Sequence, residues 1–470
     1  MMLKLQTVKG AGWTVSSRLI GRLIDFIVLL LLARLLSPND FGLIAIASSL
    51  ISIIDMLFEI PITQALTRLK EVTKSDLDTA FTIGLIRGLF ISLIVAIAAY
   101  PISLIYHDSR LSILVLSLVV APISRGLYSP SMVRYLRGIQ FMPIFFMELA
   151  GKIIGGFAAF ICAYNNGSYW SLAANTIVGS VAPACISYLL APYKPNLSMK
   201  SFSKFSSFTG WFTTSQIVAA LSWQYDRIFL GYFLERGQLG RYTMASDLSV
   251  LPNQTIVGPA MRPLTAAFVS VVNLPDRVGP AFLRSIRLTM VLSSPIALGI
   301  AIEADDIVLI ALGDQWAETA IYLPWLSIAS LLSIYASPFF ALATALDQPK
   351  LILKVNFFDA LLKVTISSVA YFFGGIASFL AARVIASGIT FYYTLWLVRA
   401  SIRISIRKQI ISLGSVAIGC CGILLAASLT RHIVGSEHLG FGRLIVVSLS
   451  GAVAYVVIIS LFFYKKNLLS

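Results

Sequence analysis

Long apolar stretches, separated by short polar segments, dominate the 470-residue chain. A membrane-spanning helix needs about 20 mostly apolar residues. Six stretches of that kind lie near residues 12–36, 41–65, 79–101, 111–133, 143–164 and 169–191. After a polar segment, further stretches lie near residues 209–234, 240–268, 281–302, 320–345, 353–373, 376–398, 409–429 and 441–464. The pattern predicts an all-α integral membrane protein with about fourteen transmembrane helices.

An internal repeat divides the predicted spans into two halves. Residues 12–66 align with residues 210–264 at a constant offset of 198 positions, and the most informative matches are Gly12 with Gly210, Trp13 with Trp211, Gly42 with Gly240 and Pro61 with Pro259. Six spans separate the copies, so both halves have the same orientation, as in transporters built from parallel repeats. We predict a lobe at residues 1–191, a cytoplasmic linker at 192–208, a second lobe at 209–400, two further helices at 401–470, and a cavity between the lobes.

Composition agrees with insertion into a membrane. Only 12% of the residues are charged, 58% are hydrophobic, and the mean hydropathy is +0.86, which is too high for a surface that faces water. The net charge of +15 does not indicate nucleic-acid binding, because the basic residues punctuate the gaps between apolar stretches. Most of them fall on one side if both termini are cytoplasmic, as the positive-inside rule predicts.

The sequence contains no recognisable catalytic or metal-binding motif. Cys162, Cys185, Cys420 and Cys421 lie inside apolar stretches and lack the spaced Cys and His partners of a zinc site. There is no phosphate-binding glycine loop, no His-Glu-x-x-His and no nucleophile elbow. We therefore expect a protein that performs no covalent chemistry and needs no cofactor.

Ionisable residues inside spans are costly and usually mark a cavity or a pair. On the first span, Arg18, Arg22 and Asp25 are spaced by four and three residues, which places them on one helical face. They either line a cavity, or Arg18 reaches to the interface while Arg22 and Asp25 neutralise each other. Both interpretations are open at this stage.

The second span carries Asp55 and Glu59, which would share a face and repel each other in a continuous helix. They are expected either to pair with Arg18 and Arg22 or to carry a coupling proton or sodium ion. Elsewhere, pairs spaced by four residues suggest bonds within one helix, as for Glu148 with Lys152 and Asp359 with Lys363.

A cavity with several arginines suits a substrate that contains phosphate, since the guanidinium group stays charged and binds phosphate oxygens with a fixed fork. The candidate phosphate contacts are Arg18, Arg22, Arg87, Arg125 and Arg262. The candidate ion-coupling residues are Asp25, Asp55, Glu59, Asp226 and Asp247. An exporter of cationic drugs would depend on acids instead.

Three stretches of the sequence carry a family resemblance. The first joins Gly10-Ala11-Gly12-Trp13 to the later stretch Ala33 to Gly42, ARLLSPNDFG. The second is Asp226-Arg227 followed by Leu239-Gly240-Arg241-Tyr242, and the third is the proline-rich segment from Pro252 to Pro263. These stretches resemble the polysaccharide-transporter family, the Wzx-type oligosaccharide flippases, within the superfamily of multidrug, oligosaccharidyl-lipid and polysaccharide exporters. The likeness covers the whole fourteen-helix plan.

The resemblance implies a function in the bacterial inner membrane. Such a protein would flip polyprenyl-diphosphate-linked oligosaccharide from the cytoplasmic to the periplasmic leaflet by alternating access, for exopolysaccharide, lipopolysaccharide or capsule biosynthesis. It also implies membrane lipid, and polysaccharide polymerase and export machinery, as partners. A multidrug or toxin exporter of the same fold is the alternative. A membrane-embedded polymerase or ligase would need a large outer loop with Arg and His, which the sequence lacks.

Overall fold

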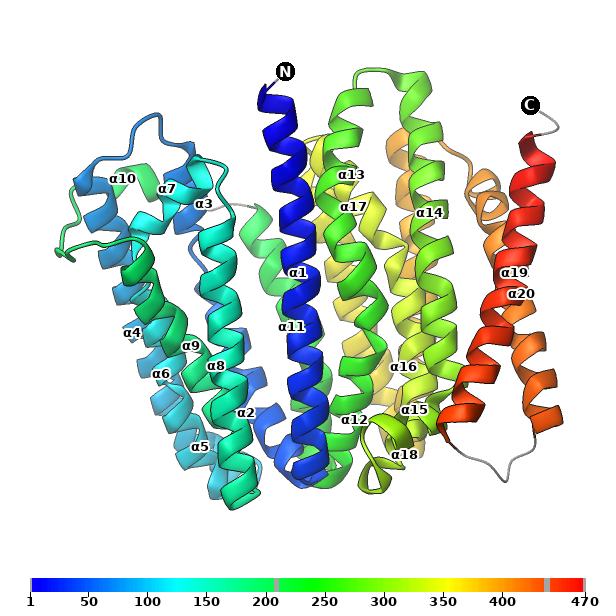
Figure 1. The fold of residues 1–470 in the computed structure, drawn as a ribbon, viewed down its shortest axis with the longest axis horizontal. Helices are drawn as coiled ribbons and strands as arrows, with labels where there is room; N and C mark the ends of the chain where they lie inside the picture. Colours follow the sequence, from blue (N-terminus) through cyan, green and yellow to red (C-terminus); the bar gives the residue numbers. More distant parts are fainter. Residues whose placement is uncertain (1, 207–210, 435–439, 468–470) are drawn as a thin grey trace. The chain divides into compact units, whose positions relative to one another are not determined.

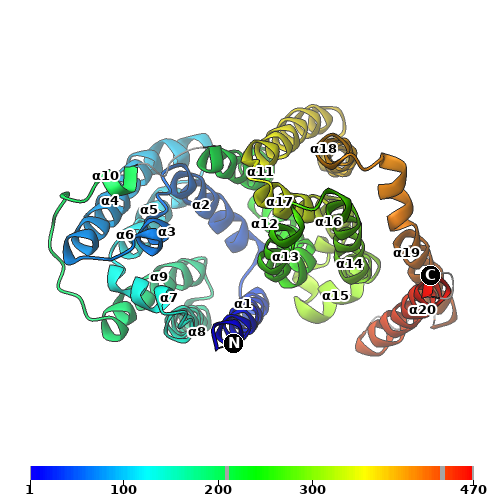
Figure 2. The ribbon, with the colours of Figure 1, turned by 90° about the horizontal axis from the view of Figure 1, so that it is seen from above.

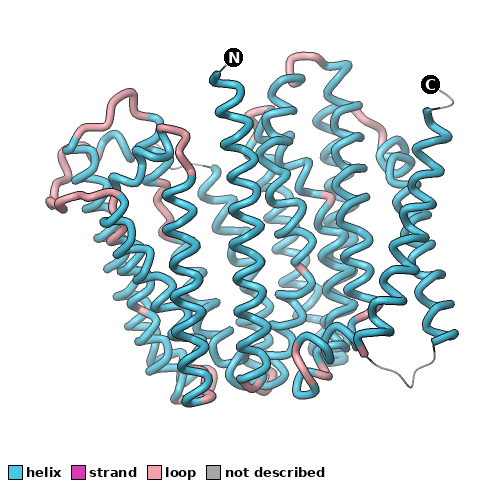
Figure 3. The backbone as a smooth tube through the Cα atoms, viewed as in Figure 1, coloured by secondary structure: helices cyan, strands magenta, loops and turns pink. Residues whose placement is uncertain are grey.

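The computed structural model describes residues 2–206, 211–434 and 440–467, and within these ranges it leaves out a small set of side chains. That set comprises residues 2–18, 204, 206, 211–216, 262, 275, 434 and 463–467. The side chains of Arg18 and Arg262, two candidate phosphate contacts, therefore lie outside the description. All regular elements of the described residues are helices, which confirms the predicted class (Figure 3).

The chain divides into two compact units, residues 1–240 and residues 241–470, and Figure 1 shows the helices within each unit running side by side. Unit 1 contains α1 (Met2–Leu35), α2 (Pro38–Leu57), α3 (Ile62–Arg68), α4 (Lys74–Ile105), α5 (Arg110–Leu118), α6 (Val120–Gly126), η1 (Pro130–Met132), α7 (Val133–Arg137), α8 (Met142–Asn166), α9 (Trp170–Leu190), α10 (Ser203–Ser206) and α11 (Trp211–Phe233). The predicted lobe limits at 191 and 209 stay a prediction.

Helix α12 (Arg236–Ser249) begins in unit 1 and ends in unit 2. Unit 2 continues with η2 (Asn253–Val257), α13 (Gly258–Val271), α14 (Pro275–Ile302), α15 (Ala304–Ala311), η3 (Asp314–Trp316), α16 (Thr319–Ile334), α17 (Ala336–Ala345), α18 (Pro349–Ile402), α19 (Ile406–Val434) and α20 (Phe441–Asn467). The η2 segment is a single π-helical turn, bracketed by Pro252 and Pro259. The proline-rich eighth predicted span is thus a helix interrupted at its centre.

Nine helical segments in the described residues are long and apolar enough to cross a membrane, or ten if the bent pair Arg110–Gly126 and Pro130–Arg137 forms one span. Apolar side chains such as Ile97, Phe157 and Leu461 are more than half exposed on these segments, as lipid contact requires. The chain is therefore a multi-pass membrane protein, while the count of fourteen spans stays a prediction.

The 54-residue helix α18 is long enough for two spans. At 1.5 Å per residue it would extend about 80 Å if straight, whereas the hydrocarbon core is about 30 Å thick. Gly374 and Gly375 interrupt it with non-helical backbone angles, and the φ of +62° at Gly375 is one that glycine adopts without strain. This break falls between the predicted spans 353–373 and 376–398.

A tight crossing joins the start of α2 to the start of α12 inside unit 1. A Cβ atom on Gly42 would lie 1.9 Å from the backbone oxygen of Arg236, and one on Gly240 would lie 1.9 Å from the backbone oxygen of Pro38. Gly42 and Gly240 are partners in the internal repeat, and Pro38 and Arg236 are separated by the same 198 positions. The repeat therefore meets itself in a reciprocal contact that only glycine permits.

The first turn of α2 is fixed by local capping. Ser37 caps the helix in a capping box with Asp40, whose carboxylate accepts from the backbone N–H and the hydroxyl of Ser37. Pro38 follows at the first helical position, where its missing N–H leaves no bond unmade. The other oxygen of Asp40 accepts from the N–H of Tyr169 at 2.9 Å, which ties this turn to the start of α9.

Arg236 locks the turn between α11 and α12 to the turn after α4. Its guanidinium donates to the backbone oxygens of Gly231 at 2.8 Å and Tyr106 at 2.5 Å, and lies 3.5 Å from Asp108. Burial opposes the ionisation of Asp108, yet the hydrogen bonds and charges of Arg110 and Arg236 outweigh it and lower the pKa of this carboxyl. We call the contacts of Gly42, Gly240, Asp40, Arg236 and Asp108 the α2–α12 joint.

Buried ion pairs attach the last two helices to the rest of unit 2. Arg431 on α19 lies 3.1 Å from Glu303, and Arg443 on α20 lies 3.2 Å from Asp306. Glu303 and Asp306 are almost fully buried at the junction of α14 and α15. Loss of one partner would leave a buried charge uncompensated, so these pairs fix where α19 and α20 dock.

We predict that Gly240→Ala destabilises the protein by about 1–3 kcal/mol, because its methyl group would force the two helix starts apart. The matched control is Gly299→Ala in α14, where a Cβ atom would have nothing within 4 Å. That change should be neutral or stabilising by roughly 0.5–1 kcal/mol, since it removes glycine from a helix interior. Thermal unfolding of both variants in detergent checks the difference, and equal effects would contradict the crossing.

We also predict that Asp108 contributes stability that depends on pH. Its folded pKa is lowered, so the contribution is fully present above the unfolded value of about 3.9 and is lost as pH falls through the folded value. The melting temperature of the native chain should therefore exceed that of Asp108→Asn both at pH 6 and at about pH 4, and the difference should shrink only as the pH falls further, toward the lowered folded value. A difference that does not shrink as the pH falls further would argue against the ionised carboxylate.

Candidate functional site

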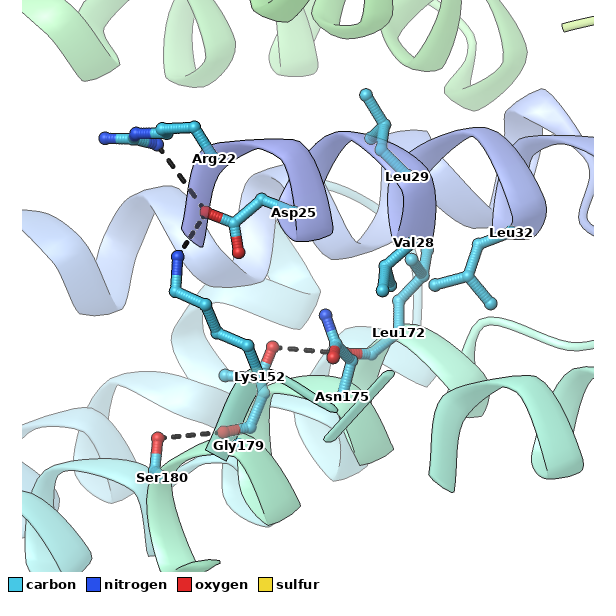
Figure 4. Close-up of a pocket in the computed structure, with 11 residues that line it drawn as sticks. Arg22, Asp25, Val28, Leu29, Leu32, Lys152, Leu172, Asn175, Gly179 and Ser180 are labelled. Atoms are coloured by element: carbon cyan, nitrogen blue, oxygen red, sulfur yellow. Dashed lines mark hydrogen bonds and ion pairs between the residues drawn. The ribbon is translucent and has the colours of Figure 1, made fainter. Parts of the chain in front are cut away.

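A cavity of about 440 Å³ lies among α1, α8 and α9 inside unit 1 (Figure 4). Its polar wall includes two basic residues and one acid, and its apolar wall consists of leucine and valine side chains. The lining residues are Arg22, Asp25, Val28, Leu29, Leu32, Lys152, Leu172, Asn175, Thr176, Gly179 and Ser180. Its volume is within the range of ligand sites, which makes it the candidate binding site.

Glycines set the spacing of the three helices around the cavity. A Cβ atom on Gly151 would lie 2.2 Å from the ring of Pro183, and one on Gly155 would lie 2.9 Å from Gly179, both on α9. On the other side of α8, a Cβ atom on Gly156 would lie 2.6 Å from Val28 of α1. These close approaches hold α8 between α1 and α9 and so place Lys152 in the cavity wall.

Lys152 makes the strongest polar contacts in the cavity. Its ammonium nitrogen lies 2.5 Å from the carboxylate of Asp25 and donates to the backbone oxygen of Gly21 at 3.1 Å. The sequence interpretation paired Lys152 with Glu148 on its own helix and did not include it in the site. The contact with α1 could not be read from spacing, because it joins helices about 130 residues apart.

Arg22 has a looser attachment to the same carboxylate. Its guanidinium lies 3.9 Å from Asp25, and about half of its side chain is exposed. Arg22 and Asp25 thus neither form an isolated neutral pair nor point into lipid, since both line the cavity and Lys152 holds the carboxylate more closely (Figure 4). The cavity wall carries two positive charges and one negative charge, so it favours an anion.

A second charge cluster lies at the end of α2. Asp55 forms ion pairs with Arg87 on α4, at 2.6 Å, and with Arg125 on α6. Arg87 also donates to the backbone oxygens of Asp55 at 2.9 Å and Phe58 at 2.7 Å, and these carbonyls belong to the last turn of α2. The two arginines therefore close the end of this helix.

This arrangement corrects one of the two expectations for the second span, the pairing of Asp55 with Arg22. Asp55 pairs with Arg87 and Arg125, while Arg22 lies beside Asp25. A role of Asp55 and Glu59 in ion coupling stays a prediction. Helix α2 ends at Leu57 and α3 starts after Pro61, so Glu59 lies in an exposed, non-helical segment. A proline cannot continue the hydrogen-bond ladder, and the break removes the one-turn spacing on which the expected repulsion depended.

The remaining candidates lie in other places. Asp226 is buried on α11 and Asp247 is half-buried on α12, and neither lines the cavity. Asp359 and Lys363 form the predicted pair within α18, at 2.5 Å. The structure thus brings together Arg22 with Asp25, and Asp55 with Arg87 and Arg125, as two separate sites.

The sequence matches the profile of the family described as polysaccharide biosynthesis protein over residues 31–321. The chain belongs to this family. The match confirms the resemblance to polysaccharide transporters and flippases that the motifs indicate, and it places the chain among membrane transporters for polysaccharide biosynthesis.

Two relatives extend the comparison. The chain is 23% identical over 372 residues to the lipopolysaccharide biosynthesis protein WzxC of Escherichia coli (strain K12), covering 77% of this chain and 74% of WzxC. It is 23% identical over 313 residues to the succinoglycan biosynthesis transport protein ExoT of Rhizobium meliloti (strain 1021), covering 66% of this chain and 63% of ExoT. Both relatives are named for polysaccharide biosynthesis.

Solved structures agree at the level of the fold. The lipid II flippase MurJ, in an inward closed conformation, superposes with a TM-score of 0.79 over 98% of this chain and 100% of MurJ, at 14% identity. An inward-facing multidrug resistance transporter of the MATE family superposes with a TM-score of 0.61 over 82% of this chain and 98% of that one, at 13% identity. This chain thus shares its fold with a lipid II flippase and a multidrug resistance transporter.

We predict that Asp55→Asn destabilises the protein by roughly 2 kcal/mol, because it removes the charge that compensates Arg87 and Arg125. Glu59→Gln is the matched control, since it neutralises an exposed carboxylate four residues further on. The control should change stability by less than about 0.5 kcal/mol. Thermal unfolding in detergent compares them, and equal losses would count against the Asp55 cluster.

Proposed function

We propose that this chain flips an oligosaccharide, linked by diphosphate to a polyprenol, from the cytoplasmic to the outer leaflet of a bacterial inner membrane. Both termini would be cytoplasmic, and the cavity would open alternately to the two sides. Family membership and the two relatives named for polysaccharide biosynthesis support the process. The flippase fold supports the type of movement.

The observation that carries the proposal is the charge of the cavity. Among its lining residues, Arg22 and Lys152 are basic and Asp25 is the single acid. A guanidinium group binds phosphate oxygens through two parallel hydrogen bonds, and an ammonium group adds a compact positive charge. The apolar wall of Val28, Leu29 and Leu32 would exclude part of the water around a bound diphosphate, which would strengthen both interactions.

The Asp25 carboxylate gives the cavity a way to release its ligand. A bound diphosphate would compete with Asp25 for Lys152, whose nitrogen now lies 2.5 Å from that carboxylate. Asp25 would then lose its closest counter-charge and become the group that accepts a coupling proton or cation. We keep Asp226 and Asp247, which lie outside this cavity, as further candidates for ion coupling.

The same geometry argues against export of cationic drugs through this cavity. A lipophilic cation needs an available carboxylate, and Asp25 already bonds to Lys152 and lies within ion-pair range of Arg22. The two cations would repel such a drug at close range. Glycan polymerase and export machinery, which act on a flipped product, are the partners we propose.

We predict that the chain restores surface polysaccharide in a bacterium that lacks its own flippase for that glycan, and that Arg22→Ala lowers the rate of restoration about tenfold or more. The loss follows from removing one charge-assisted contact to the diphosphate. Surface glycan and carrier-linked precursor are measured together, because blocked flipping causes the precursor to accumulate inside the cell.

The controls separate binding from folding. Arg22→Lys keeps the charge and should retain part of the activity, while Arg277→Ala, an exposed arginine in unit 2, should behave as the native chain. All variants are compared at equal membrane abundance. Failure to rescue several such hosts, together with resistance to cationic dyes, would replace the flippase proposal with the drug exporter.

A further inference from the structure

Residues 192–202, the segment between α9 and α10, are held against α4 by hydrogen bonds on the side of the segment that faces this helix. The Tyr193 hydroxyl donates to Asp78 at 2.5 Å, and the Ser198 N–H donates to Thr82 at 2.9 Å. Asp78 and Thr82 are both buried. These hydrogen bonds to buried groups of α4 fix the position of the segment. Residues 192–202 of the predicted linker are therefore an ordered part of unit 1.

The end of this segment is fixed as well. The Ser201 N–H donates to the hydroxyl of Thr79 at 3.2 Å. Three residues after the segment, Phe205 is buried in an apolar cluster with residues that include Leu66 of α3 and Ile83 of α4. We call residues 192–202 the strap.

Three large apolar side chains on the strap point away from the protein. The exposed fractions are 67% for Leu197, 45% for Met199 and 47% for Phe202. Figure 2 shows the strap following the outer edge of unit 1 beside α4, on the side away from α1. Since the inner side of the strap is fixed by hydrogen bonds, this exposure is imposed by the structure.

Basic residues lie on the strap and elsewhere at the same end of unit 1. Lys194 and Lys200 are exposed on the strap, whose sequence contains no acid. The helices and turns at the same end of unit 1 add one exposed acid, Glu71, and five exposed basic residues, Arg68, Lys70, Lys74, Arg134 and Arg137. Apolar side chains framed by Lys and Arg are the pattern of a surface that enters the headgroup region of an anionic leaflet.

We propose that the strap is a binding site for the headgroups of anionic phospholipids in the cytoplasmic leaflet. Leu197, Met199 and Phe202 enter the boundary between headgroups and acyl chains, while Lys194 and Lys200 bind the phosphates. The inference rests on the proposed orientation, which places this end of unit 1 in the cytoplasm. It goes beyond the proposed transport function because these residues are separate from the cavity.

The test uses the full chain in nanodiscs of phosphatidylcholine alone or with phosphatidylglycerol added. Backbone hydrogen exchange of residues 192–202 and the melting temperature are measured in both. We expect phosphatidylglycerol to slow exchange in the strap at least threefold and to raise the melting temperature by several degrees. Lys194→Gln with Lys200→Gln should abolish most of both effects.

The matched control removes two exposed lysines elsewhere, Lys354→Gln with Lys408→Gln in unit 2, and should respond to phosphatidylglycerol as the native chain does. Equal responses in both double variants would overturn the proposal, because the effect would then reflect net charge alone. Protection that appears only when a polyprenyl diphosphate is added would also overturn it, since the strap would then bind the transported lipid. A flippase failure would appear in the glycan assay and leave this result unchanged.

Discussion

The crossing of α2 and α12 at Gly42 and Gly240 is the contact on which the architecture of unit 1 depends. Backbone meets backbone there, so the axes of the two helices approach as closely as sterics allow, and each glycine faces a carbonyl oxygen of the opposite helix. Two hydrogen bonds attach neighbouring segments to this crossing. Asp40 accepts from the N–H of Tyr169 at the start of α9, and Arg236 donates to the backbone oxygen of Tyr106 after α4. Close backbone packing and polar bonds thus occur within the same few residues. A methyl group added at Gly42 or Gly240 is therefore expected to disturb the whole joint.

Among the described side chains of unit 1, two small clusters of charged residues have different consequences. In the first cluster, the Asp55 carboxylate pairs with both Arg87 and Arg125, and Arg87 also donates to the carbonyls at the end of α2. These charges are therefore paired with groups of the protein itself. In the cavity, Asp25 is bonded closely by Lys152 and loosely by Arg22, which leaves positive charge facing open space. The same residue types therefore close a helix in one place and prepare an anion site in the other.

The strap, at the end of unit 1 that we propose to be cytoplasmic, is a polar segment whose conformation is fixed by hydrogen bonds to α4. Without the strap, the buried side-chain oxygens of Asp78, Thr79 and Thr82 on α4 would lack the hydrogen-bond donors that they accept from. The strap satisfies them with Tyr193 and with backbone N–H groups. Because its hydrogen bonds face inward, its apolar side chains face outward. The orientation of the strap thus follows from the hydrogen bonds that the buried polar side chains of α4 require.

The sequence by itself determined the helical class, the membrane-spanning character, the repeat and the family. Even the gap between residues 373 and 376 coincided with the break at Gly374 and Gly375, since apolar length and glycine are local signals. Only the tertiary structure decided that Lys152 bonds Asp25, that Asp55 binds two arginines, and that Glu59 lies outside a helix. The apolar character and the length of a helix depend on consecutive residues, so both can be predicted from the sequence. The partner of a charge depends instead on which helices pack together, and that is set by contacts between residues far apart in the sequence.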